Sequence, residues 1–182
     1  MAQKQASDQT VVETFVPEVD GSDMGNGEGT GEVRLESNFD LEAEHKDAPL
    51  IPQGTYTANV IDTKFDSEAQ TIEWLFTLVD NGGVMSDGET SVDGVMVTTK
   101  NWLPKEGDEN ELTKSGKMTK RQAKINMLFN FLKDMGCPEK TSDAIDKALN
   151  NKEWVGKRAK LQIGLRTYEG RIFNEVKRAV AA

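Results

Sequence analysis

The sequence predicts a domain that is mostly β with one main helix (α+β), in the order β-β-β-α-β-β, behind an acidic N-terminal arm. Three observations carry this prediction. Apolar and polar residues alternate in five segments, a helical spacing appears between the third and fourth of them, and charge is divided unevenly along the chain. The length of 182 residues suits one domain of ordinary size plus a tail.

The first 48 residues differ from the rest in charge. They hold 12 acidic and 3 basic residues, a net charge of −9, whereas the other 134 residues hold 19 of each. Their stretch DGSDMGNGEGTGE, at residues 20–32, is rich in Gly and acid and buries too little apolar area to fold. We therefore predict a disordered acidic arm at residues 1–48 and a folded domain at residues 49–182. Because that domain is neutral overall, an anionic ligand is not excluded.

Alternating patterns predict the strands. Residues 70–80 show the pattern best, because Trp74 and Phe76 fall on one face while Leu75 makes the other face partly apolar, as in a central strand. The Asn81-Gly82-Gly83 run that follows is a strong turn signal. The five predicted strands are residues 55–62, 70–80, 94–103, 158–167 and 171–180.

A helical spacing separates the third predicted strand from the fourth. Ile125, Leu128, Phe129 and Leu132 recur at intervals of three and four, and a Gly-Cys-Pro run ends the segment. A short second helix is predicted at residues 142–150. This element order matches the five-stranded oligonucleotide-binding barrel, the OB-fold, although other α+β arrangements share it.

Composition and the absence of known motifs exclude several classes of protein and several kinds of site. No apolar run reaches the 18 or so residues of a membrane helix, and the first residues resemble neither a signal nor a transit peptide. One cysteine, Cys137, and one histidine, His45, exclude an internal disulfide and a Cys/His zinc site. Asp62 and Asp66, near the end of the first strand, fit turn or edge positions better than a metal site. We expect no enzymatic activity, no cofactor and no metal, because no catalytic motif is found.

Basic residues concentrate in two segments of the domain. Residues 112–124 carry five basic residues and no acid, and residues 157–178 have a net charge of +5. Positive charge interleaved with aromatic rings is what a protein that binds single strands needs, since cations neutralise phosphates and exposed rings stack on bases. The candidate nucleic-acid-binding residues are Lys100, Trp102, Lys114, Lys117, Lys120, Arg121, Lys124, Lys157, Arg158, Lys160, Arg166, Tyr168, Arg171, Phe173 and Lys177.

Structural roles compete with binding at several of these positions. Trp74 is expected in the core, and Trp154 is expected mainly to pack. For Trp102 and Tyr168 the sequence allows two roles, stacking on a base or packing within the fold. The lysines of residues 114–124 also fit a loop and the solvated face of a helix, and the acidic run KEGDENE at residues 105–111 is predicted to be solvated surface.

Three segments of the domain resemble a known family. PLIPQGTYTANVIDTKFD, KINMLFNFLKDMG and EWVGKRAKLQIGLRTYEGRIFNEVKR are similar to a phage-encoded family of single-stranded-DNA-binding proteins. That family was long filed as a domain of unknown function and is found beside phage recombination and replication genes. The resemblance spans residues 49–178 and is most specific at residues 155–164 and 174–178. It implies an OB-type barrel, no catalysis, and single-stranded DNA as the ligand.

We therefore expect a phage protein that coats or protects single-stranded DNA in replication or recombination, in the cytoplasm of the infected cell. The alternative is a non-enzymatic interaction or structural protein, such as a virion component or an inhibitor of a host system, that uses its acidic arm. Many single-strand binders carry their acidic tail at the C-terminus, whereas here the acid is N-terminal. The arm is expected either to compete with DNA for the basic segments or to contact replication and recombination proteins. The sequence does not decide whether the protein prefers single-stranded DNA or RNA, or whether it forms a homo-oligomer.

Overall fold

The computed structural model describes residues 40–45 and 47–182. The chain divides into two units, Met1–His45 and Lys46–Ala182. In the first unit the described part contains the short helix α1 (Leu41–Glu44), where the Asp40 carboxylate accepts hydrogen bonds from the backbone N–H groups of Glu42 and Ala43. The sequence did not predict this helix, and residues 1–39 and 46 of the predicted disordered arm lie outside the described residues.

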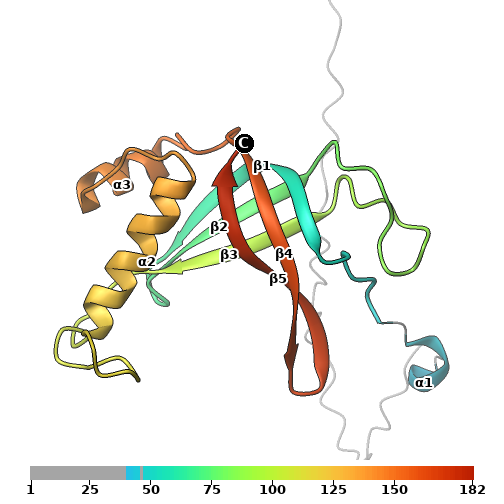
Figure 1. The fold of residues 1–182 in the computed structure, drawn as a ribbon, viewed down its shortest axis with the longest axis horizontal. Helices are drawn as coiled ribbons and strands as arrows, with labels where there is room; N and C mark the ends of the chain where they lie inside the picture. Colours follow the sequence, from blue (N-terminus) through green and yellow to red (C-terminus); the bar gives the residue numbers. More distant parts are fainter. Residues whose placement is uncertain (1–39, 46) are drawn as a thin grey trace, which may run out of the picture. The chain divides into compact units, whose positions relative to one another are not determined.

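The second unit is built on a five-stranded antiparallel sheet in the order β3-β2-β1-β4-β5 (Figure 1). Its strands are β1 (Gly54–Asp66), β2 (Thr71–Leu78), β3 (Met96–Trp102), β4 (Arg158–Tyr168) and β5 (Arg171–Ala181). All five predicted strands are therefore confirmed, and β1 runs four residues beyond its predicted end. Asp66 closes β1 by accepting hydrogen bonds from the N–H groups of Glu68 and Ala69, which is the turn role that the sequence favoured.

The predicted five-stranded barrel is not confirmed, because the sheet is open between its edge strands β3 and β5. The Asn174 side chain of β5 bonds to the chain ahead of β1 instead. Its Oδ1 accepts from the Ile51 N–H and its Nδ2 donates to the Ile51 carbonyl, both at 2.8 Å. A cleft of about 290 Å³, lined by residues of both edge strands and by Ile51, separates β3 from β5.

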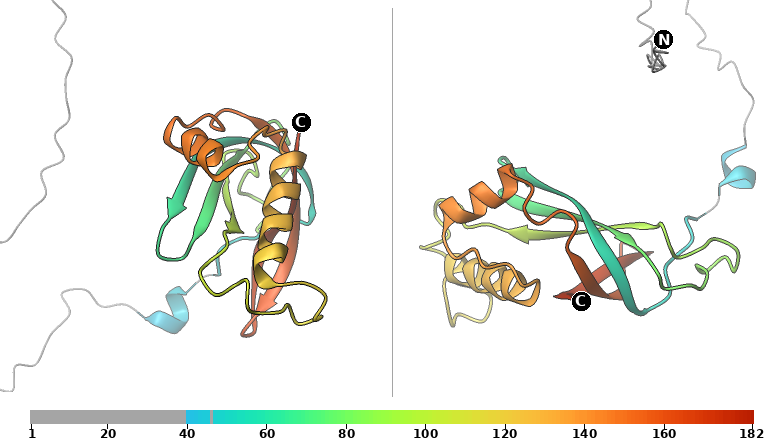
Figure 2. Two further views of the ribbon diagram at one scale, coloured as in Figure 1. Left: turned by 90° about the vertical axis from the view of Figure 1, so that its left-hand side faces the viewer. Right: turned by 90° about the horizontal axis from the view of Figure 1, so that it is seen from above.

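Two helices connect β3 to β4, as predicted: α2 (Lys120–Asp134) and α3 (Ser142–Asn150). Threonines cap both, since Thr119 Oγ1 accepts from the Gln122 N–H and Thr141 Oγ1 accepts from the Ala144 N–H. Figure 2 shows both helices at the end of the sheet where β3 finishes. Within the described ranges, no helix combines the length and the apolar character needed to span a membrane.

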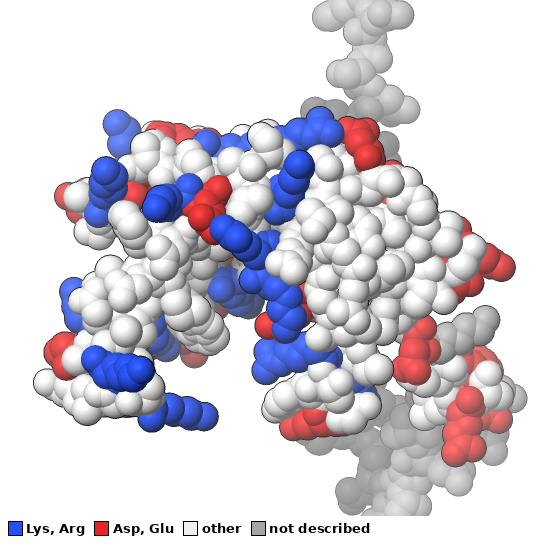
Figure 3. Space-filling model, in the orientation of Figure 1, with Lys and Arg blue, Asp and Glu red and all other residues white. Residues whose placement is uncertain are grey.

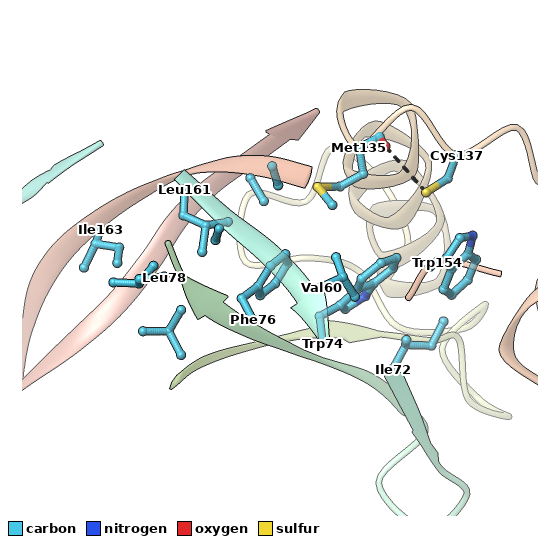
Figure 4. Close-up of a cluster of buried hydrophobic side chains, with 14 of the residues drawn as sticks. Val60, Ile72, Trp74, Phe76, Leu78, Met135, Cys137, Trp154, Leu161 and Ile163 are labelled. Carbon is cyan, nitrogen blue, oxygen red and sulfur yellow. Dashed lines mark hydrogen bonds between the residues drawn. The ribbon is translucent and has the colours of Figure 1, made fainter. Parts of the chain in front are cut away.

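Aromatic rings fill the core between the sheet and the helices (Figure 4). Trp74 stacks on Trp154, with centroids 4.7 Å apart, and Phe131 of α2 lies tilted against Trp74 at 5.0 Å. Both tryptophans are fully buried, which confirms the core position predicted for Trp74 and the packing role predicted for Trp154. Cys137 is also buried, and burial raises its pKa to about 11.

Candidate nucleic-acid interface

The outward face of β4 and β5 gathers most of the sequence-predicted site residues from residues 157–178. In β4 the side chains of Ala159, Leu161 and Ile163 are buried on the core side. Because alternate residues of a strand point to opposite faces, Lys160 and Arg166 both point outward. They therefore share the outward, polar face of β4.

The tip of the β4–β5 hairpin carries two exposed rings between two guanidinium groups. The strand register pairs Arg166 with Phe173 and Tyr168 with Arg171, so all four share the outward face. Tyr168 is 56% exposed and Phe173 is 47% exposed. Glu169 and Gly170 both have positive φ, at 48° and 77°, which suits the tight two-residue turn of a hairpin.

Arginine also contacts one of these rings directly. The Cζ atom of Arg166 lies 5.9 Å from the centroid of the Tyr168 ring, within the range of a cation–π interaction. The arginine therefore helps to hold the ring on the outward face, where it stays accessible to solvent.

Several cations of this face form no ion pair with a carboxylate among the described residues. Within the described part of the chain, Lys160, Arg166 and Arg171 form no ion pair, whereas Arg158 pairs with Asp80 at 2.6 Å and Arg178 with Asp134 at 3.0 Å. Figure 3 shows the Lys and Arg side chains as a band that follows the hairpin to its tip. We call Arg158, Lys160, Arg166, Tyr168, Arg171, Phe173, Lys177 and Arg178 the hairpin face.

One carboxylate interrupts the hairpin face. Glu175 is the acidic residue of β5, and it accepts a hydrogen bond from Lys177 Nζ. This bond, followed by the charges of Lys177 and Arg166, lowers the pKa of Glu175 below its usual value, so the side chain is ionised at neutral pH. Glu175 therefore neutralises Lys177, as Asp80 neutralises Arg158 and Asp134 neutralises Arg178 on the same face.

A shallow groove of about 310 Å³ runs beside Lys177, between the start of β1 and the middle of β4. Its lining includes Gly54 and Gly164, and the Lys177 side chain lies across Gly164. A Cβ atom at position 164 would lie 3.0 Å from Lys177 Cε, so a larger residue would displace the lysine. Glycine at 164 thus allows the amine to lie close to the strand.

Sequence reasoning missed Arg178 as a site residue. Strict alternation from Arg171 would turn Arg178 toward the core, but a bulge leaves Lys177 unpaired and matches Arg178 with the outward Gln162. No turn or glycine signal marks this bulge in the sequence. Lys157, in contrast, was predicted but is only half-exposed, with its Nζ donating to the Gly136 carbonyl at 3.3 Å.

The structure does not bring Lys100 and Trp102 to the hairpin face. Both lie on β3, the opposite edge strand of the sheet. Lys100 pairs with Glu73 at 3.4 Å, and Trp102 is 49% exposed beside Thr71. These two residues therefore belong to a separate surface.

The basic segment at residues 112–124 is partly neutralised by folding. Lys120 pairs with Glu111, and Lys124 pairs with Asp108 at 2.7 Å, while Lys114, Lys117 and Arg121 form no ion pair among the described residues. Asp108 is mostly buried, and the hydrogen bond from Lys124 lowers its pKa. The prediction that the KEGDENE run is solvated surface is therefore wrong for Asp108.

Acidic side chains near the end of β1 are used in ion pairs. Asp62 accepts from Lys152 Nζ at 2.7 Å and lies 3.7 Å from Lys64 Nζ. The bond from Lys152 lowers the pKa of Asp62. Across the residues that the structure describes, no three His, Cys, Asp or Glu side chains gather as a metal site would require.

Comparison with protein-family models and with curated proteins found no match to this chain.

Proposed function

We propose that the protein binds single-stranded DNA through the hairpin face, without catalysis, and coats or protects strands during phage replication or recombination. The observation that carries the proposal is the combination of unpaired cations (Lys160, Arg166, Arg171) with the exposed rings of Tyr168 and Phe173 on one face. Cations attract phosphates and release counterions, while the rings stack on bases of any sequence. Paired bases offer no free face for stacking, so a duplex is the weaker ligand.

We also propose that the domain is an OB-type barrel left open between β3 and β5. OB-folds are five-stranded, partly open barrels, and the loop between their fourth and fifth strands is one of their ligand-binding loops. That loop corresponds to the Glu169-Gly170 turn at the tip of the hairpin face. The location of the candidate site therefore agrees with the use that this fold makes of the same loop.

A non-enzymatic interaction protein is the second candidate function. Exposed apolar residues on α2 favour it, since Ile125, Met127 and Phe129 all face solvent. The ion pairs of Lys100, Lys120 and Lys124 also reduce the charge available for phosphates outside the hairpin face. If this candidate is correct, charge changes on the hairpin face will leave affinity for DNA unaltered.

Titration of a fluorescently labelled dT oligonucleotide with the full chain tests the proposal. The double variant Lys160→Glu/Arg166→Glu should bind at least about tenfold more weakly. Its slope of log K against log salt should be smaller by about 1.4, since each phosphate contact on a single strand contributes about 0.7. Both side chains are solvent-exposed, so the melting temperature should change little.

The matched control is Lys140→Glu/Lys147→Glu, which makes the same change in net charge. Both lysines are exposed beside or within α3 and form no ion pair among the described residues. The control should keep the affinity of the unmodified protein. Equal losses in the two double variants would show that net charge alone acts, and would contradict a site on the hairpin face.

A further inference from the structure

The hairpin tip alternates rings and guanidinium groups in two rows. Arg166 lies opposite Phe173, and Tyr168 lies opposite Arg171, so each ring has a guanidinium beside it on the neighbouring strand. The two rings are diagonal neighbours, and so are the two arginines. Among the described residues neither arginine forms an ion pair, so both stay available to phosphates.

The spacing of the two rings constrains the ligand. The backbone positions of diagonal neighbours on an antiparallel pair of strands are about 7–8 Å apart, and the two rings extend from positions with this spacing. Successive units along one strand of a DNA duplex are only about 3.4 Å apart. Two consecutive bases therefore reach both rings only when the strand is extended and the bases no longer stack on each other.

We propose that Tyr168 and Phe173 take two consecutive bases of an extended strand, while Arg166 and Arg171 contact the phosphates beside them. This inference rests on the proposed function and adds the conformation and class of the ligand. Because binding separates neighbouring bases, strands whose bases stack weakly on each other, such as pyrimidine tracts, bind better than adenine tracts. The preference comes from the cost of unstacking rather than from hydrogen bonds to base edges.

Oligonucleotides of 16 positions test the inference, with affinities measured on the full chain: dT16, dA16, a fully abasic strand, and abasic strands that carry two thymines. The two thymines are adjacent in one such strand and six positions apart in another. The unmodified protein should prefer dT16 to dA16, and adjacent thymines to separated ones.

The variant Tyr168→Leu/Phe173→Leu keeps apolar bulk and removes both rings. It should lose at least about fivefold in affinity for dT16 per ring, lose both preferences, and bind the abasic strand as before. Phe65→Leu is the matched control, because Phe65 is 46% exposed on β1, away from the hairpin tip, and should change none of these affinities.

Three results would overturn the inference while leaving the proposed function intact. They are equal affinity for adjacent and separated thymines, equal affinity for dT16 and dA16, and equal losses of the leucine variant on dT16 and on the abasic strand. Failure of the proposed function gives a different result, because dT16 itself would then not bind.

Discussion

Removing the carboxylate of the hairpin face should tighten binding of single-stranded DNA. The variant Glu175→Gln keeps the shape of the side chain but removes the charge that neutralises Lys177. The freed ammonium should then gain one phosphate contact, which steepens the slope of log K against log salt by about 0.7. The side chains of Glu175 and Lys177 are 37% and 47% exposed, so solvent screens the pair. A unit charge interaction near 4 Å in water, about 1 kcal/mol, then corresponds to a gain of about fivefold at low salt.

Fluorescence anisotropy of labelled dT16 at 50 and 200 mM salt measures this gain. With a slope steeper by about 0.7, the advantage of Glu175→Gln should shrink by about 2.6-fold between these two concentrations. Because the pKa of Glu175 is lowered, the carboxyl stays ionised at pH values above its usual range, and the advantage should not change between pH 8 and pH 5.5.

Glu89→Gln is the matched control for this experiment. Glu89 is exposed in the loop before β3, forms no ion pair among the described residues, and gives the same change in net charge. If Glu175→Gln bound no more tightly than Glu89→Gln at low salt, Lys177 would not be held back by Glu175. Lys177 would then not belong to the residues of the hairpin face that bind DNA.

Three further predictions concern the core, the arm and the partly buried ion pair of Asp108 with Lys124. Trp74→Ala should lower the melting temperature, with a loss of about 3–5 kcal/mol in unfolding free energy, because Trp74 packs fully buried between Trp154 and Phe131; loss of DNA binding with unchanged stability would contradict this. Deleting residues 1–48 removes the net charge of −9 and should raise affinity for single strands at low salt, with a gain that fades as salt rises; if affinity does not change, the arm does not compete with DNA. Asp108, whose pKa is lowered, should stabilise the fold at neutral pH, and this contribution should be lost as pH falls through and below about 4. Asp108→Asn should lower the melting temperature at pH 7 more than at pH 3, and an equal effect at both values would refute the role of the charge.

Local pattern was enough to predict most of the elements. The alternation of Ile72, Trp74, Phe76 and Leu78 predicted the buried face of β2. Alternate residues of a strand point to opposite faces of the sheet, so the apolar set is the one that faces the core. The second helix was predicted at its observed bounds, 142–150, where Thr141 supplies a favourable cap. These features depend on residues within one or two turns of each other.

Features that depend on tertiary contacts escaped the sequence analysis. The bonds of Asn174 to Ile51 join residues 123 positions apart, and nothing in either neighbourhood indicates them. Lys124 was counted as a free cation because its own segment has no acid, yet folding places the Asp108 carboxylate beside it. The hairpin tip, which is half of the candidate site, could be predicted from alternation and a turn signal. Which of the basic residues form ion pairs could be seen only in the structure.

The salt dependence of dT16 binding, compared with a duplex of the same length, tests the central claim most directly. The hairpin face holds six cations (Arg158, Lys160, Arg166, Arg171, Lys177 and Arg178). Three of them, Lys160, Arg166 and Arg171, form no ion pair among the described residues, so with three phosphate contacts the slope of log K against log salt should be about −2 for the single strand. The duplex should bind far more weakly, since its bases cannot stack on Tyr168 and Phe173. A slope near zero, or equal affinity for the duplex, would contradict single-strand binding by the hairpin face.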